Sequence, residues 1–265
     1  MILKDGEFSL VLSGGGALGI AHLGVLQDMQ SLDLTPCEIV GTSMGGIVGA
    51  CLGVGMKPDE IYSLFEEFSN VLNWLRFSFE GDSIIKISKI EKIFEHIFKD
   101  MKMCDVKIPL KLIATEFKSA KERVFSQDDD IKIKDALLAT MAIPGIFEAK
   151  EIDGIVYVDG FLCENLGVNQ ATLKKILAVD VLGENSFEKE LPKRFFKTQN
   201  VMEMFEKSLR MLILNQTKAN LKHLDKEIVL LEPDTKEYKT FQFHKYKEIR
   251  ELGKGLLISD MASQA

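Results

Sequence analysis

The sequence predicts an α/β fold, a three-layer α/β/α sandwich with a mainly parallel central sheet. Two successive units carry this prediction: a strand over 8–12 followed by a helix over 17–29, and a strand over 38–41 followed by a helix over 47–52. In each unit a short apolar strand enters a glycine-containing turn before the helix, and strands connected in this way pair in parallel. The composition suits a sizeable core, since 46% of the 265 residues are hydrophobic and 28% are charged.

Helices and strands continue to alternate along the rest of the chain. Helical patterns cover 58–68 and 87–98. The loop expected between them, 70–82, is rich in apolar side chains, which suit the lining or lid of an acyl-chain channel as well as they suit an ordinary core. Further strands are predicted over 110–114, 124–125, 155–158, 176–181 and 228–231.

A single domain over 1–265 is expected, because the chain contains no internal repeat and no low-complexity linker. Its core covers about 8–182, and an extension of helix and strand covers about 195–265. A polar surface loop is predicted over 184–193, and a long amphipathic helix over 198–224. The apolar residues of that helix are expected to pack in the core rather than touch a membrane; they are Met202, Phe205, Leu209, Leu212 and Ile213.

Charge and hydropathy exclude several classes of partner. The net charge of −7 argues against nucleic acid as a partner. No apolar stretch reaches the roughly 18 residues that span a bilayer, and the N-terminus lacks the pattern of a secretory signal. The four cysteines form no C-x-x-C pair, so we expect reduced core thiols and neither a metal nor a cofactor. The expected protein is cytoplasmic and at most peripheral to a membrane.

A glycine-rich turn, Gly14-Gly-Gly-Ala-Leu-Gly19, follows the first strand. It matches the dinucleotide-binding pattern G-x-G-x-x-G, so an NAD-dependent oxidoreductase is one alternative. That alternative requires an acidic residue at the end of the second strand, where this chain has Gly-Thr-Ser-Met-Gly-Gly. Consecutive glycines before a helix also point several backbone N–H groups into one small space, which suits a phosphate or the oxyanion of an ester under attack.

The second turn contains the pattern of a nucleophile elbow, Gly41-x-Ser43-x-Gly45. In this pattern a sharp turn between strand and helix lifts the serine hydroxyl clear of the sheet. A side chain at Gly41 or Gly45 would collide with the neighbouring strand or with the turn. Both turns leave the carboxyl ends of parallel strands, so they are expected at the same edge of the sheet.

A serine nucleophile needs a neighbouring base, which is usually histidine. The four histidines are His22, His96, His223 and His244. The first two lie on helical patterns where packing or solvent exposure is expected. The last two follow Ser43 and Asp159 in the chain order of an α/β-hydrolase triad, so a triad stays open as an alternative. The better candidate is Asp159, because it ends a strand and is followed by Gly160, which leaves the carboxylate room to approach a partner.

Taken together, these motifs resemble those of the patatin-like phospholipase family. The resemblance runs from about residue 8 to at least residue 181. It rests on four motifs in the family's order: the glycine turn with Ala-His-Leu-Gly-Val-Leu26, the turn Gly41-Thr-Ser-Met-Gly-Gly46, Ala142-Ile-Pro-Gly-Ile-Phe147, and Asp159-Gly-Phe161 with Asn165.

The resemblance implies a lipid acyl hydrolase with a Ser-Asp dyad and an acyl-enzyme intermediate. It makes Ser43 the nucleophile and Asp159 the base, and it implies that Pro144 shapes the wall near the nucleophile. The oxyanion hole would consist of backbone N–H groups at Gly14, Gly15, Gly16 and Met44. The substrate would be a phospholipid, a lysophospholipid or another acyl ester.

The chain departs from the family pattern in three places. Leu18 stands where the family usually has Arg or Lys, and Phe161 where it usually has Gly or Ala. The family's Asn-x-Pro after the aspartate is altered to Asn165-Leu-Gly167. Loss of the basic residue leaves the backbone donors intact but weakens the case for a recognised phosphate head group. A non-catalytic lipid-binding member of the family is therefore a further alternative.

Overall fold

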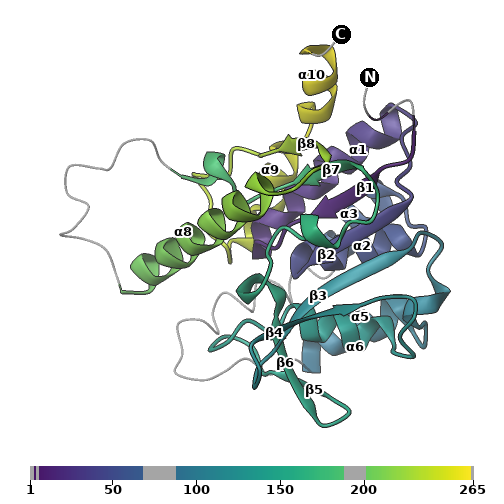
Figure 1. The fold of residues 1–265 in the computed structure, drawn as a ribbon, viewed down its shortest axis with the longest axis vertical. Helices are drawn as coiled ribbons and strands as arrows, with labels where there is room; N and C mark the ends of the chain where they lie inside the picture. The colour runs from purple at the N-terminus through teal and green to yellow at the C-terminus, as the bar shows by residue number, and fades with distance from the viewer. Residues whose placement is uncertain (1–2, 4–5, 68–87, 188–200, 264–265) are drawn as a thin grey trace.

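A computed structural model describes residues 3, 6–67, 88–187 and 201–263 of the chain (Figure 1). In this part of the chain an eight-stranded sheet has the order β5-β6-β3-β2-β1-β7-β8, with β4 also paired to β3. The strands are β1 (Ser9–Leu12), β2 (Glu38–Thr42), β3 (Leu110–Glu116), β4 (Lys121–Phe125), β5 (Lys150–Ile152), β6 (Ile155–Asp159), β7 (Lys175–Val179) and β8 (Glu227–Leu231).

Strands β3, β2, β1, β7 and β8 pair in parallel, whereas β4, β5 and β6 join the sheet in antiparallel pairs. The sheet is therefore mixed but mainly parallel, as predicted. Strand β8 comes from the region expected to be an extension, and it pairs along β7 from Lys175 opposite Glu227 to Val179 opposite Leu231.

Helices cover both faces of this sheet. They are α1 (His22–Ser31), α2 (Met44–Gly53), α3 (Pro58–Glu67), α5 (Ser88–Phe98), α6 (Ile133–Thr140), α8 (Val201–Lys222), α9 (Tyr246–Glu251) and α10 (Leu256–Ser263). Side chains of alternate strand residues point to opposite faces. Leu10 and Leu12 join the larger core with α1, α2 and α6, and Val11 joins a smaller core against which Leu221 of α8 packs. Two cores separated by one sheet make the predicted three-layer sandwich.

Several elements differ from the sequence-based expectations. The helix expected over 17–29 is divided into a 3-10 helix, η1 (Gly16–Ala21), and α1. Strand β5 and helices α9 and α10 were not predicted, because they are short and lack a clear hydrophobic period. The predicted loop 70–82 and most of the predicted loop 184–193 lie outside the described residues.

The predictions for cysteines and for the long amphipathic helix were partly wrong. All four thiols are free, but only Cys51 is buried; Cys37 and Cys104 are exposed. On α8, Ile213 is buried, whereas Phe205 and Leu212 are exposed. Among the helices in the described ranges, none is both long and apolar enough to cross a membrane.

Candidate active site

Ser43 is placed at the junction between β2 and α2. Its backbone angles, φ 52° and ψ −121°, are ones that a residue with a side chain rarely adopts, and such a conformation costs on the order of 1–3 kcal/mol. The surrounding structure holds it there, because the Ser43 N–H donates to Thr140 Oγ1 at 2.9 Å. The Thr140 hydroxyl also donates to the carbonyl of Ile113 in β3. A buried threonine on α6 thus fixes the backbone of the candidate nucleophile.

The glycines of this turn are required by close backbone approaches. A Cβ atom on Gly41 would lie 2.6 Å from Gly46 Cα, within the turn itself. One on Gly45 would lie 2.3 Å from the carbonyl oxygen of Leu12, in the neighbouring strand β1. Separations this short do not occur between real atoms, so only glycine fits either position without a shift of the backbone.

The glycine turn lies directly against Ser43. A Cβ atom on Gly14 would be 3.2 Å from Ser43 Cβ, and Gly16 and Ser43 both line one cavity. Two N–H groups of the turn are already bonded: Gly14 donates to the carbonyl of Asn165 at 3.3 Å, and Ala17 donates to the carbonyl of Thr240 at 2.7 Å. Between them, the N–H groups of Gly15 and Gly16 have no hydrogen-bond partner among the described residues.

These hydrogen bonds reduce the number of backbone N–H groups that are open to serve as oxyanion donors. Gly14 is the weakest of the four candidates, since its N–H already has an acceptor. The N–H of Met44 is the first of helix α2 and has no partner in the described part of the chain. The Gly15, Gly16 and Met44 donors therefore remain open, and the amino end of α2 adds a positive field near Ser43.

Asp159 is fully buried at the end of β6. Its own N–H donates to the carbonyl of Ala142, and its carbonyl accepts from Thr115 Oγ1 at 3.0 Å. In the side chain, Oδ1 accepts the N–H of Phe161 at 3.0 Å, whereas Oδ2 has no hydrogen-bond partner in the described ranges. The next residue, Gly160, lies against the backbone of β3. A Cβ atom there would be 2.2 Å from the Ile113 carbonyl oxygen, so only glycine fits this position.

Burial raises the pKa of Asp159 from 3.8 to about 7. The Phe161 N–H and the Ser43 hydroxyl act in the opposite direction, so the two candidate catalytic side chains are close enough to interact. No Ser43–Asp159 hydrogen bond of good geometry is present among the described side chains, however. The Ser43 hydroxyl lies near the carboxylate without being aligned to it.

No hydrogen bond joins a described histidine side chain to Ser43 or Asp159. None of the described histidines lines the cavity that contains Ser43. His22 is fully buried beneath the glycine turn, where its Nε2 bonds the Ser13 carbonyl at 2.9 Å. Burial lowers the pKa of His22 to about 4, so its imidazole is neutral at physiological pH.

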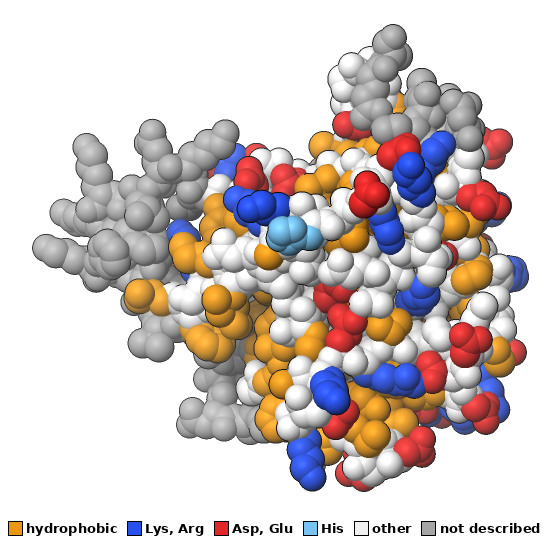
Figure 2. Space-filling view, viewed as in Figure 1, with side chains coloured by type: hydrophobic (Ala, Val, Ile, Leu, Met, Phe, Trp, Pro, Cys, Tyr) orange, Lys and Arg blue, Asp and Glu red, His pale blue; other side chains and the backbone are white. Residues whose placement is uncertain are grey.

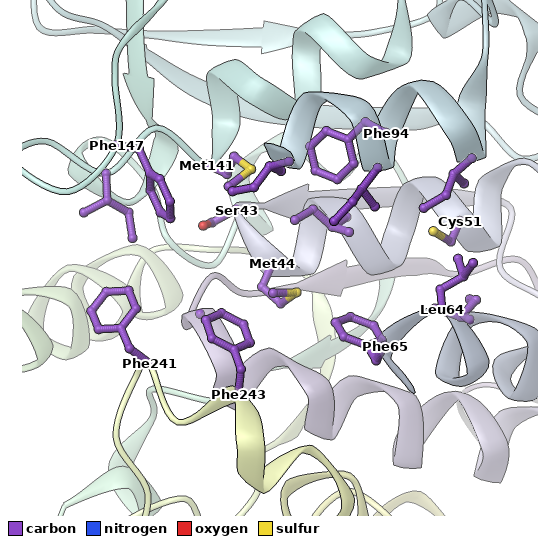
Figure 3. Close-up of a pocket in the computed structure, with 17 residues that line it drawn as sticks. Ser43, Met44, Cys51, Leu64, Phe65, Phe94, Met141, Phe147, Phe241 and Phe243 are labelled. Atoms are coloured by element: carbon purple, nitrogen blue, oxygen red, sulfur yellow. The ribbon is translucent and has the colours of Figure 1, made fainter. Parts of the chain in front are cut away.

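An apolar cavity of about 90 Å³ opens beside Ser43 (Figure 3). Figure 3 shows it extending past Met44 toward Cys51 and Leu64 on one side of Ser43, and toward Phe147 and Phe241 on the other. Apart from Ser43, its described lining carries no hydroxyl, amide or charged side chain; it consists of Gly16, Met44, Ile47, Cys51, Ile61, Leu64, Phe65, Ile90, Ile93, Phe94, Ile97, Met141, Ile143, Phe147, Phe241 and Phe243.

The remaining sequence candidates take supporting places. A Cβ atom on Gly19 would lie 2.5 Å from Met44 Cγ, so this glycine lets η1 pack against α2. Pro144 is exposed and does not line the cavity; the neighbouring Ile143 and Phe147 line it instead. Leu18 is fully buried in the core.

Three contributors were missed at the sequence level: Thr140, Phe241 and Phe243. Their sequence neighbourhoods contain no catalytic motif, and they reach the site only through tertiary contacts. For Thr140 the partner, Ser43, is 97 residues away in the chain. The alternation of aromatic and polar residues at Phe241-Gln-Phe243 is the one signal that could have pointed to an apolar wall.

Comparison with known proteins assigns the family. The sequence model of patatin-like phospholipases matches residues 10–172, which is more than half of the chain. The chain belongs to the patatin-like phospholipase family. The matched region of this patatin-like protein includes the glycine turn, Ser43 and Asp159, and it ends before α8.

Curated relatives match this patatin-like chain over part of their length. An NTE family protein of Mycobacterium bovis is 29% identical over 160 residues, covering 60% of this chain and 43% of the relative. The cUMP-AMP-activated phospholipase of Escherichia coli is 25% identical over 180 residues, covering 59% and 55%. Lysophospholipase NTE1 of Saccharomyces cerevisiae is 24% identical over 277 residues, covering 95% and 16%. The chain thus spans between 16% and 55% of the length of these relatives.

Among solved structures, VipD of Legionella pneumophila superposes with a TM-score of 0.53. The match covers 97% of this chain and 67% of the VipD chain, at 13% sequence identity. At that identity the likeness shows a shared fold, which agrees with the sandwich described above.

Proposed function

We propose that this chain hydrolyses carboxylic esters of lipids, as a phospholipase A, lysophospholipase or related esterase, with Ser43 as nucleophile and Asp159 as base. One observation carries the proposal: Ser43 is the polar side chain in the wall of an apolar cavity, and it lies beside a buried carboxylate whose Oδ2 has no other described partner. Membership of the patatin-like family supports the same class of reaction.

In the proposed first step, Asp159 Oδ2 takes the proton of the Ser43 hydroxyl as Oγ attacks the ester carbonyl carbon. The carbonyl oxygen becomes an oxyanion, which accepts hydrogen bonds from Gly15, Gly16 and Met44. The carbon–oxygen bond to the alcohol then breaks, and Asp159 returns its proton to the departing alcohol. Ser43 is left as an acyl ester.

In the second step, Asp159 takes a proton from water as the water oxygen attacks the acyl-enzyme carbonyl. The tetrahedral intermediate collapses, the fatty acid leaves, and the proton returns to Ser43. A carboxylate with a pKa near 7 is a better base than an ordinary aspartate with a pKa near 3.9. Each preorganised oxyanion donor adds about a hundred- to thousandfold in rate.

The apolar cavity supports the proposal that the acyl chain is the part of the substrate that this protein binds. Apart from Ser43, the described lining has no hydroxyl, amide or charged side chain to bind a charged head group, whereas each methylene that leaves water contributes about 0.8 kcal/mol. The alcohol side of the ester would then face the opening near Ser43. The buried Leu18, in the family's basic position, supplies no charge there.

We propose further that the outward face of α8 contacts the lipid surface that supplies the substrate. Four large apolar side chains on this helix are between 46% and 66% exposed: Met204, Phe205, Met211 and Leu212. Figure 2 shows hydrophobic side chains on the surface where α8 lies in Figure 1. Binding to zwitterionic vesicles should weaken in a Phe205→Ser/Leu212→Ser variant and persist in Ile258→Ser, whose side chain is also exposed but lies on α10.

The hydrolase proposal is tested with p-nitrophenyl esters, lysophospholipids and phospholipids as substrates. Wild type should release fatty acid, and Ser43→Ala and Asp159→Asn should each lose roughly a thousandfold or more. A His223→Ala/His244→Ala variant should keep its activity; its inactivation would favour a triad. Wild type that binds a fluorescent fatty acid but hydrolyses none of the esters would favour a non-catalytic lipid-binding protein.

A further inference from the structure

Helix α8 has four polar side chains turned inward and four large apolar side chains turned outward. Arg210 and Thr217 are buried, and Glu206 and Gln216 are half-buried, whereas Phe205 and Leu212 are exposed. An ordinary surface helix has the reverse arrangement. The inward polar groups form hydrogen bonds with two separate loops. Each of these loops is in turn hydrogen-bonded to the glycine turn beside Ser43.

The first connection passes through Asn165. Gln216 Oε1 accepts the Asn165 N–H at 3.0 Å, and Gln216 Nε2 donates to the Cys163 carbonyl at 2.7 Å. The Asn165 carbonyl accepts the N–H of Gly14 at 3.3 Å, and Asn165 Nδ2 donates to the Gly14 carbonyl at 3.4 Å. Gln216 therefore holds the residue that bonds one end of the glycine turn.

The second connection passes through Thr240. Glu206 Oε1 accepts the Thr240 N–H at 2.9 Å and the Thr240 hydroxyl at 2.6 Å. Arg210 donates to the same Glu206 oxygen at 2.7 Å and to the Tyr238 carbonyl at 3.2 Å. The Thr240 carbonyl accepts the N–H of Ala17 at 2.7 Å, which is the other end of the turn.

Between these two anchored ends lie the open N–H groups of Gly15 and Gly16. Gly16 has φ +56°, and a Cβ atom on it would be 2.4 Å from the Thr240 carbonyl oxygen. The strand-to-helix turn is therefore pressed against the Thr240 loop at the residue that supplies a candidate oxyanion donor. A shift in the position of the Asn165 or the Thr240 carbonyl would therefore rotate the peptide groups of Gly15 and Gly16.

We infer that α8 sets the direction of the oxyanion-hole donors, with Gln216 and the Glu206–Arg210 pair as positioning residues. The inference rests on the proposed hydrolase function and adds to it a part of the chain beyond residues 10–172, where the family match ends. Donors aimed at the transition-state oxyanion contribute to the chemical step and little to the binding of the ground-state ester. Loss of the hydrogen bonds between α8 and the two loops should consequently lower kcat and leave KM nearly unchanged.

The test uses the full-length chain and a soluble p-nitrophenyl ester of medium chain length. Gln216→Met removes the first connection, and Arg210→Met weakens the second by removing the bonds to Glu206 and to the Tyr238 carbonyl. Each variant should lower kcat by about tenfold or more, with KM within about twofold. Arg210→Lys, which keeps a cationic donor, should recover part of the loss. The control is Lys218→Met on the same helix, because Lys218 makes a solvent-exposed ion pair with Glu184 and should have wild-type kinetics.

A second readout separates positioning from general loosening of the fold. A trifluoromethyl ketone with the same acyl chain forms a tetrahedral oxyanion on Ser43, whereas the corresponding alcohol does not. In Gln216→Met and Arg210→Met the inhibition constant of the ketone should rise in parallel with the loss in kcat, and that of the alcohol should stay constant. Thr240→Val, which removes only the hydroxyl that donates to Glu206 and accepts from Arg210, provides the milder variant if Arg210→Met does not fold.

Two results would overturn the inference while leaving the hydrolase proposal intact. One is a kcat in the folded Gln216→Met and Arg210→Met variants that equals the kcat of an active wild-type protein. The other is a loss that appears in KM, with ketone and alcohol affinities falling together. An inactive wild type would contradict the hydrolase proposal itself.

Discussion

The backbone N–H of Phe161 donates a 3.0 Å hydrogen bond to Oδ1 of Asp159. This bond orients the carboxylate and leaves Oδ2 as the oxygen that can receive a proton from Ser43. It also favours the ionised carboxylate, but desolvation is the larger effect, and the pKa of Asp159 is raised to about 7. The bond comes from the backbone, so the unusual Phe161 side chain does not prevent it.

Ester hydrolysis should rise with pH through an apparent pKa near 7, because only ionised Asp159 can accept a proton. The measurement is kcat/KM between pH 5 and 9. Burial also raises the pKa of Glu164 to about 7 and that of Asp180 to about 6, so Glu164→Gln and Asp180→Asn serve as controls. A profile that is flat over this range, or one whose rise disappears in either control, would contradict the assignment to Asp159.

Asp159→Asn should be inactive yet more stable than wild type at alkaline pH. The folded state raises the pKa of this carboxyl, so it favours the protonated form. The contribution of Asp159 to stability is therefore present below its unfolded pKa of about 3.8 and is lost as pH rises to about 7. Urea unfolding should show a gain of up to about 4 kcal/mol for the variant at pH 8 and little gain at pH 4. Equal differences at the two pH values would contradict this account.

Gly45→Ala should destabilise the protein by about 3 kcal/mol or more, because its Cβ would lie 2.3 Å from the Leu12 carbonyl oxygen. Gly53→Ala at the other end of α2 is the matched control. Its Cβ would lie 3.5 Å from the nearest atom, in ordinary contact, so stability should be unchanged or higher by up to about 1 kcal/mol. Thermal unfolding measures both, and similar losses in the two variants would contradict the predicted role of Gly45.

Cys51→Phe should shift the proposed hydrolysis toward esters with shorter acyl chains. Ser43 and Cys51 are separated by about 12 Å along α2 at about 1.5 Å per residue, which is the extended length of about ten carbons. Excluding about three methylenes at about 0.8 kcal/mol each predicts a fall of about fiftyfold in kcat/KM for a dodecanoyl ester. Butyrate ester hydrolysis should change little, and Cys104→Phe, at an exposed position, should keep the wild-type profile. Equal losses for the dodecanoyl and the butyrate ester would contradict the proposal that the acyl group extends from Ser43 toward Cys51.

The sequence was informative where function depends on short stretches of backbone. The turns at Gly14 and Ser43 contain the glycines that close approach requires, so their geometry is encoded locally. Contacts between distant segments have no such signal. Thr140 is 97 residues from Ser43, and Asn165 is 51 residues from Gln216. The hydrogen bond from Gly14 N–H to Asn165 also depends on such a contact, so the family resemblance gave no sign of it when it implied Gly14 as an oxyanion donor.

Helix α8 illustrates a different limit. Its hydrophobic period is visible in the sequence, and apolar residues on one face ordinarily mean that this face is buried. Here Glu206, Arg210 and Gln216 take the inner face because loops around Asn165 and Thr240 need hydrogen-bond partners. The inner and outer faces of a helix cannot be assigned from periodicity when polar side chains have buried backbone groups to satisfy.

The central claim is that Ser43 is an activated nucleophile, and covalent labelling tests it most directly. An alkyl fluorophosphonate, which loses fluoride as Oγ bonds to phosphorus, is incubated with the folded protein, and the site is mapped by peptide mass spectrometry. We predict one adduct per chain, on Ser43, that is absent in Ser43→Ala and forms much more slowly in Asp159→Asn. A folded wild-type protein that stays unmodified, or that is modified at another residue while Ser43 is not, would contradict the account.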